Sequence, residues 1–129
     1  MAHPNEDVLR DAYAAFARGD LQAYLSYCTD DVTFHVPGHG RVAGDYSRAE
    51  FVTPFISQVV ELTNGTFREE VLDVVANDRR GVVLLHHEFE RDGQRYDYRT
   101  AHLYRIEQGK LAEFAEYPAD LYRFDEAWG

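Results

Sequence analysis

Residues 95–106 read RYDYRTAHLYRI, and the alternation within this stretch decides the fold class. Alternate residues of a β-strand point to opposite faces of the sheet. One face of this predicted strand therefore carries most of the charges, and the other carries mainly aromatic and polar groups from Tyr96, Tyr98, Thr100, His102 and Tyr104. Valine, isoleucine and leucine are typical of a buried core face. Phenols around a histidine are more typical of a ligand cavity, which is apolar with a few placed polar groups.

The same period of two continues through the second half of the chain. It predicts four strands joined by turns of about two residues, at 66–76, 81–91, 94–107 and 110–118. Such short connections produce an antiparallel meander.

Helical spacing dominates the first half of the chain. It predicts a helix over 5–18 that begins at Asn5, a shorter helix after Asp20, and a third helix after a Ser47–Glu50 capping box. A short strand, 32–36, precedes Pro37. We therefore expect one α+β domain over 1–129, a cone-shaped fold with three N-terminal helices packed on a curved, mostly antiparallel sheet.

Composition excludes several classes of function. The chain has 13 basic and 23 acidic residues, a net charge of −10, and no basic cluster. It therefore lacks the footprint of a nucleic-acid-binding protein. A single cysteine excludes an internal disulfide or a multi-cysteine metal cluster. The N-terminus is polar and acidic, and apolar runs such as 82–85 are far too short for a membrane span. We expect a cytoplasmic protein without a nucleic-acid or membrane partner.

The turn at Gln108-Gly109 permits two strand registers. A two-residue turn places His102 on the face of Glu113, whereas a bulged turn places it across from Phe114 and diagonal to Glu116. A slip of one residue exchanges the two faces of a strand. Because the charged face belongs in water, we favour the bulged turn. His102 and Glu116 then become neighbours on the inner face.

The preceding turn, Asp92-Gly93, decides which of two adjacent histidines faces inward. A two-residue turn points His87 inward, and a bulged turn points His86 inward. The face that carries His87 is less charged, so we favour His87. Adjacent strand residues point to opposite faces and cannot bind one ion together. With no third ligand evident in the sequence, we expect no metal.

Several stretches resemble the nuclear-transport-factor-2-like superfamily, and within it the SnoaL-like group of polyketide cyclases and steroid-isomerase relatives. They are 13–20 (YAAFARGD), 30–38 (DDVTFHVPG), 43–46 (AGDY), 102–110 (HLYRIEQGK) and 113–120 (EFAEYPAD). The resemblance places Glu116 where the cyclases carry an aspartate that acts as the base, and Phe114 where they carry a histidine. Val36 stands where steroid isomerases carry their base aspartate, which argues against that mechanism. The resemblance also implies a homodimer formed through the outer sheet face.

The leading candidates for catalysis are His102 and Glu116. Burial in an apolar cavity is expected to raise the pKa of the Glu116 carboxyl. Such a pair suits proton removal beside a carbonyl group, with Tyr98 or Tyr104 stabilising the enolate by hydrogen bonding. The residues expected to line the ligand cavity are Tyr13, Tyr24, His35, Tyr46, Phe55, His87, Tyr98, Thr100, Tyr104 and Phe114.

These features, with the resemblance, predict an isomerase, cyclase or lyase of SnoaL type that needs no cofactor. Its ligand is expected to be a small hydrophobic or carbonyl-containing molecule, as in bacterial secondary metabolism. Two alternatives remain open. The cavity could bind a small molecule without chemistry. The chain could also resemble the epoxide hydrolases of the superfamily, through Asp97 and Arg99, if Asp97 points inward.

Overall fold

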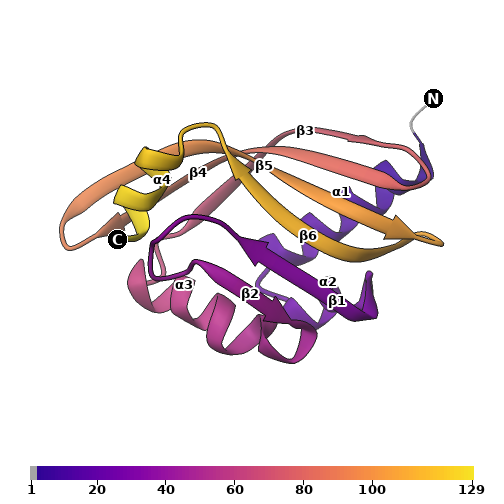
Figure 1. The fold of residues 1–129 in the computed structure, drawn as a ribbon, viewed down its shortest axis with the longest axis horizontal. Coiled ribbons are helices and arrows are strands. Elements are labelled where there is room, and N and C mark those ends of the chain that lie inside the picture. Colours follow the sequence, from indigo (N-terminus) through magenta and orange to yellow (C-terminus); the bar gives the residue numbers. More distant parts are fainter. Residues whose placement is uncertain (1–2) are drawn as a thin grey trace.

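The computed structural model describes residues 3–129 as a curved six-stranded sheet with helices packed on one of its faces (Figure 1). The helices are α1 (Pro4–Ala17), α2 (Leu21–Ser26), α3 (Ser57–Leu62) and α4 (Leu121–Trp128), and α3 follows the short helical turns η1 (Arg48–Glu50) and η2 (Phe51–Ile56). The strands are β1 (Cys28–Val36), β2 (Gly44–Ser47), β3 (Arg68–Ala76), β4 (Arg80–Arg91), β5 (Gln94–Glu107) and β6 (Lys110–Pro118).

The sheet has the strand order β2-β1-β6-β5-β4-β3. Every pairing is antiparallel except that of β1 with β6, which is parallel. The α+β class and the mostly antiparallel sheet are therefore confirmed. The last four strands lie within two residues of their predicted bounds, because tight turns fix the ends of a meander.

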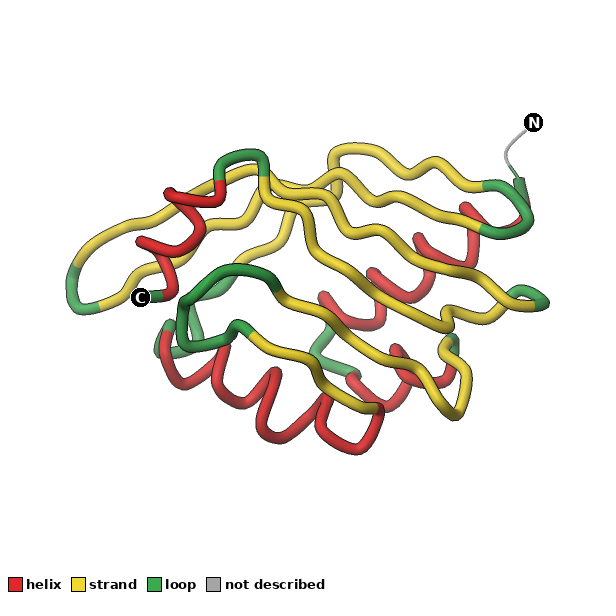
Figure 2. Tube along the Cα trace, viewed as in Figure 1, coloured by secondary structure: helices red, strands yellow, loops and turns green. Residues whose placement is uncertain are grey.

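The expectation of three helices is incomplete, since α4 follows the sheet as a fourth. Asp120 begins it, and its carboxylate accepts hydrogen bonds from the backbone N–H groups of Tyr122 and Arg123 at 3.0 and 3.2 Å. Figure 2 shows this helix beside the loop that joins β1 to β2. There the backbone N–H of Arg41 donates to the carbonyl of Trp128 at 2.8 Å. This hydrogen bond joins the last turn of α4 to the loop between β1 and β2.

The first helix begins earlier than predicted. His3 rather than Asn5 is the N-cap, and its Nδ1 accepts from the backbone N–H of Asn5 at 3.1 Å. Pro4 suits the first turn because its missing N–H would have no partner there. The Asn5 side chain is buried instead and donates to the carbonyl of Asn77 at 3.0 Å. The predicted capping box of Ser47 and Glu50 is present and begins η1.

The hairpin turns settle both registers. Asp92 and Gly93 have φ angles of 52° and 77°, so β4 and β5 join through the predicted two-residue turn. Gln108 and Gly109 have φ angles of 49° and 78°, so the second turn is also a two-residue turn. The predicted bulged turn is therefore wrong.

An irregularity in the ladder near Ile106 nevertheless restores the predicted faces. His102 lies directly opposite Glu116, and Phe114 lies opposite Tyr104. The predicted neighbours thus meet more closely than expected. Among residues 3–129, no helix is long and apolar enough to cross a membrane.

Candidate functional site

The inner face of the sheet and the helices enclose a cavity of about 60 Å³. Most of its wall is aromatic or aliphatic. Its ionisable lining groups come from the sheet and from the first two helices, and they are Glu69, His87, Tyr98, His102, Tyr104, Glu116, Tyr13 and Tyr24. Among residues 3–129, no lysine or arginine contributes to the lining.

His102 and Glu116 form the central pair of this cavity. Both are buried, and His102 Nε2 lies 3.3 Å from Glu116 Oε2. Thr100, two residues along β5, donates from its hydroxyl to the same carboxylate oxygen at 2.9 Å. The sequence predicted this pair, and the structure brings it together. Thr100 supports Glu116 from outside the cavity lining instead of facing a ligand.

The charge state of Glu116 differs from the expectation. Burial is the largest influence and by itself raises the pKa of the carboxyl, but His102, His87 and the Thr100 hydroxyl together outweigh it. The net effect is a pKa below the ordinary value of glutamate. The expected rise was wrong because it considered burial without the polar neighbours. Glu116 is therefore a carboxylate at neutral pH.

A chain of tyrosine hydroxyls leads to His102. Tyr24 contacts Tyr104 at 2.8 Å, Tyr104 contacts Tyr13 at 2.7 Å, and the Tyr13 hydroxyl lies 2.5 Å from His102 Nδ1. Burial raises the pKa of all three phenols well above its ordinary value, so each keeps its proton. Donation can run along the chain in either direction. If it runs toward His102, a neutral imidazole carries its proton on Nε2. If it runs away, Nε2 presents a lone pair.

A second acid–histidine pair, Glu69 with His87, was missed by the sequence reasoning. The two residues lie opposite each other on β3 and β4, and Glu69 Oε2 is 2.8 Å from His87 Nε2. The other ring nitrogen, Nδ1, lies 3.2 Å from the Tyr98 hydroxyl, which accepts from the Trp128 indole N–H at 2.9 Å. His87 faces inward as predicted. Glu69 adjoins Glu70, so composition alone gave no sign of which one faces the cavity.

Besides Thr100, two residues expected at the cavity lie outside its lining. His35 is on the outer face of β1, because its neighbours Phe34 and Val36 face inward, and it is half-buried between Asp45 (2.7 Å) and Glu113 (3.3 Å). Tyr46 donates its hydroxyl to a backbone carbonyl at 2.7 Å and stacks behind Phe55 at 4.6 Å between ring centroids. The other predicted lining residues do face the cavity: Tyr13, Tyr24, Phe55, His87, Tyr98, Tyr104 and Phe114.

The outer face also holds Asp97 and Arg99. Asp97 accepts from Arg123 at 2.6 Å and lies 3.0 Å from His86 Nε2, both outside the cavity. The inward orientation required for the epoxide hydrolase arrangement is therefore not found.

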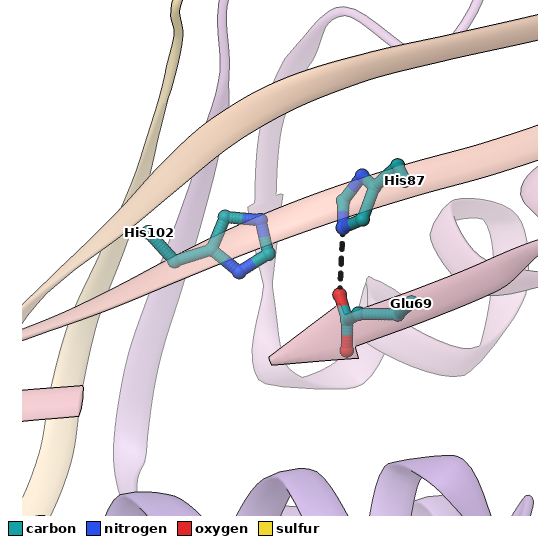
Figure 3. A group of neighbouring side chains, drawn as sticks. All are labelled: Glu69, His87 and His102. Carbon is teal, nitrogen blue, oxygen red and sulfur yellow. Dashed lines mark hydrogen bonds and ion pairs between the residues drawn. The ribbon is translucent and has the colours of Figure 1, made fainter. Parts of the chain in front are cut away.

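Three cavity residues supply potential metal ligands. Glu69, His87 and His102 each offer one ligand atom, and these atoms all lie within 4.8 Å of one another (Figure 3). The sequence argument considered only His86 and His87, which indeed face opposite sides. It overlooked that His102 and Glu69 join His87 from the neighbouring strands.

Comparisons with known proteins agree with this architecture. The family model for the SnoaL-like domain matches residues 9–114, so the chain belongs to the SnoaL-like family, which has the nuclear-transport-factor-2-like fold. An uncharacterised protein of Mycobacterium tuberculosis, Rv0034, is 28% identical over 95% of this chain and 94% of its own length.

Solved structures of similar chains have the same fold. Bal32a, from a soil-derived mobile gene cassette, superposes with a TM-score of 0.90 at 29% identity, over 99% of this chain and 98% of its own. A protein of unknown function with a cystatin-like fold from Xanthomonas campestris superposes with a TM-score of 0.83 at 27% identity, over 100% and 99% of the two chains.

Proposed function

We propose that this SnoaL-like protein is an enzyme that removes a proton beside the carbonyl group of a small, partly hydrophobic molecule. Cyclisation, isomerisation or dehydration would follow from the resulting enolate. One observation carries the proposal: a buried carboxylate, Glu116, lies in a mainly apolar, aromatic cavity beside an imidazole and several phenols.

Each group has a specific task in this proposal. Glu116 takes the proton as the general base, in the position at which cyclases of this fold carry theirs. Tyr98 or Tyr104 donates a hydrogen bond to the enolate oxygen, because both residues line the cavity and keep their protons; Tyr104 does so by turning its proton away from Tyr13 or Tyr24. His102, whose Nε2 lies 3.3 Å from Glu116 Oε2, donates a proton to the product and regains one from Glu116, which restores the starting state. The aromatic wall excludes water, which strengthens each of these interactions.

The chemistry of known fold neighbours is compatible with an organic ligand. TerC, which is 21% identical with a TM-score of 0.83, has been co-crystallised with polyporic acid. At this identity the likeness concerns the fold, so the proposal depends on the cavity of this chain.

Exchange of carbon-bound hydrogen in D₂O tests the proposal without knowledge of the product. A panel of small ketones and aromatic carbonyl compounds is incubated with the protein, and deuterium uptake beside the carbonyl group is followed by mass spectrometry. We expect Glu116→Gln to slow exchange by about 10²–10⁴-fold, the usual contribution of a general base. Glu113→Gln, on the outer face of the same strand, is the matched control and retains the wild-type rate.

Two results would contradict the proposal. If Glu116→Gln and His102→Ala both exchange at the wild-type rate, neither residue acts in proton transfer. If compounds are retained tightly with no exchange in any variant, the protein binds small molecules without chemistry.

A further inference from the structure

The cavity carries two negative side chains without a fixed positive partner. Glu69 and Glu116 have side-chain exposures of 11% and 8%, and no lysine or arginine of the described part of the chain lines the cavity. Buried carboxylates are costly unless a cation or several hydrogen bonds compensate them. The His87 ring and the Thr100 hydroxyl hydrogen-bond to these carboxylates, but neither group is a fixed positive charge. The cavity is therefore a site where a cation would be strongly stabilised.

The imidazoles around these carboxylates are held in the way that metal-binding histidines are held. A ligating histidine is usually fixed by a hydrogen bond at its other ring nitrogen. Here the Tyr13 hydroxyl lies 2.5 Å from Nδ1 of His102, and the Tyr98 hydroxyl lies 3.2 Å from Nδ1 of His87. In each case the tyrosine engages Nδ1, which leaves Nε2 as the candidate ligand atom; that of His87 is hydrogen-bonded to Glu69 Oε2 at 2.8 Å.

The Nε2 atom of His102 gives an independent observation. It is buried and has no hydrogen-bond partner within the part of the chain that the structure describes. Glu116 Oε2 lies 3.3 Å away but outside hydrogen-bond geometry. A buried ring nitrogen without a partner calls for a ligand. His87 Nε2 is close by, facing Glu69 at 2.8 Å, and the two imidazole rings lie 5.5 Å apart between centroids.

We propose that Glu69, His87 and His102 bind a divalent first-row transition metal ion such as zinc. Two imidazoles and one carboxylate are a ligand set that such ions favour over magnesium or calcium, which prefer oxygen alone. The three ligand atoms lie within 4.8 Å of one another, and those around a tetrahedral ion lie about 3.3 Å apart. Binding of a tetrahedral ion therefore requires these atoms to draw closer together than they lie in this structure.

The site goes beyond the function proposed above, which requires no metal. Three protein ligands leave at least one coordination position for a water molecule or a ligand, as in catalytic zinc sites. Glu116 stays outside the ligand set and remains available as a base, whereas a metal-bound His102 no longer transfers a proton through Nε2. In the metal-bound state the tyrosine chain runs away from His102, so that Nδ1 donates to Tyr13 and Nε2 presents its lone pair.

The surface provides a matched control for this site. His86, on the outer face, also lies between two acids, but through different ring nitrogens: Nδ1 is 3.8 Å from Glu70, and Nε2 is 3.0 Å from Asp97. These nitrogens point in different directions, so His86 and its acids cannot converge on one ion. Its substitution should leave specific metal binding unchanged.

The experiment is a titration of untagged, chelator-treated protein with Zn²⁺, followed by calorimetry. We expect one equivalent to bind to the wild type and to His86→Gln. Glu69→Gln and His102→Gln should each weaken binding by more than about 100-fold, since even outer-shell changes cost 10–100-fold. Mg²⁺ should not bind at this site. Equal Zn²⁺ affinity in the wild type, Glu69→Gln and His102→Gln would overturn the proposal.

A second measurement covers the case in which the variants fail to fold. Co²⁺ added to the wild type should give the intense visible absorption of a four- or five-coordinate site, and the weak spectrum of aqueous Co²⁺ alone would overturn the proposal. The two proposals fail separately. Absence of Zn²⁺ binding with slow exchange in Glu116→Gln removes only the metal, whereas Zn²⁺ binding with wild-type exchange in Glu116→Gln removes only the proton-transfer function.

Discussion

Substitution of Tyr104 by phenylalanine tests the hydroxyl chain without any substrate. Tyr104 is buried, and its hydroxyl contacts those of Tyr13 at 2.7 Å and Tyr24 at 2.8 Å. Its removal therefore breaks two hydrogen bonds. Tyr13 retains His102 as a partner, but the Tyr24 hydroxyl loses the one partner that it has among residues 3–129.

The magnitude follows from counting these bonds. At about 1 kcal/mol of net stabilisation per hydrogen bond, Tyr104→Phe lowers the free energy of unfolding by about 2 kcal/mol, and Tyr24→Phe lowers it by about 1 kcal/mol. The double variant loses the same two bonds as Tyr104→Phe and leaves no hydroxyl without a partner. It should therefore be no less stable than Tyr104→Phe, which gives a coupling energy of about 1 kcal/mol.

Urea denaturation followed by circular dichroism measures these differences, provided that the transitions are two-state with equal slopes. For a domain of this size, 2 kcal/mol corresponds to a fall in melting temperature of about 8 °C. Tyr122→Phe is the control, since Tyr122 is 91% exposed. Simple additivity of Tyr24→Phe and Tyr104→Phe would refute the reasoning, as would a wild-type midpoint for Tyr104→Phe.

Three further predictions concern other parts of the molecule. A Cβ atom on Gly40 would lie 2.7 Å from Trp128 Cβ. Gly40→Ala should therefore lower the free energy of unfolding by about 1–3 kcal/mol and shift the fluorescence emission of the single tryptophan to the red. Unchanged emission would contradict this prediction. Burial raises the pKa of Cys28 to about 12, so at pH 8 a thiol reagent should label the native protein at least about 10³ times more slowly than the unfolded chain, and equal rates would contradict this. Asp45 accepts a hydrogen bond from His35 and raises the pKa of this histidine above its unfolded value of about 6.5. The stabilisation by this ion pair is complete below about pH 6 and is lost as the pH rises through the raised pKa of His35. The difference in unfolding free energy between wild type and His35→Gln should therefore shrink from pH 6 to pH 9. A difference that does not depend on pH would contradict this prediction.

Charge patterning was sufficient to predict the faces of the central strands. The outward charges of β5 fixed Tyr98, His102 and Tyr104 as inward residues, because a misplaced charge costs more than any turn preference. The same argument gave the correct face for Glu116 through an incorrect turn. Both turn types are compatible with glycine at Gly109, and the sequence does not show that an irregularity within the strand can replace a bulge at the turn.

Glu69 could not be predicted for a related reason. It precedes Glu70 on an edge strand whose ladder is interrupted between Val71 and Asp73. The alternation of residues along the strand does not show which of the two acids faces inward. The position of Glu69 opposite His87 therefore depends on a strand register that only the tertiary structure defines. The reversal of the pKa expectation for Glu116 has the same origin, since it depends on neighbours from other strands.

The origin of the cavity lining suggests how this scaffold can be altered. The carboxylates and imidazoles all stand on β3 to β6, whereas the apolar rings of Phe16, Phe55 and Trp128 come from the helical segments. Ladder hydrogen bonds hold these strand positions, on both sides in β4, β5 and β6 and on one side in the edge strand β3, whereas helix side chains can change without disturbing a register. Redesign of the shape of the cavity can therefore be confined to the helical residues, while the reactive groups stay in place.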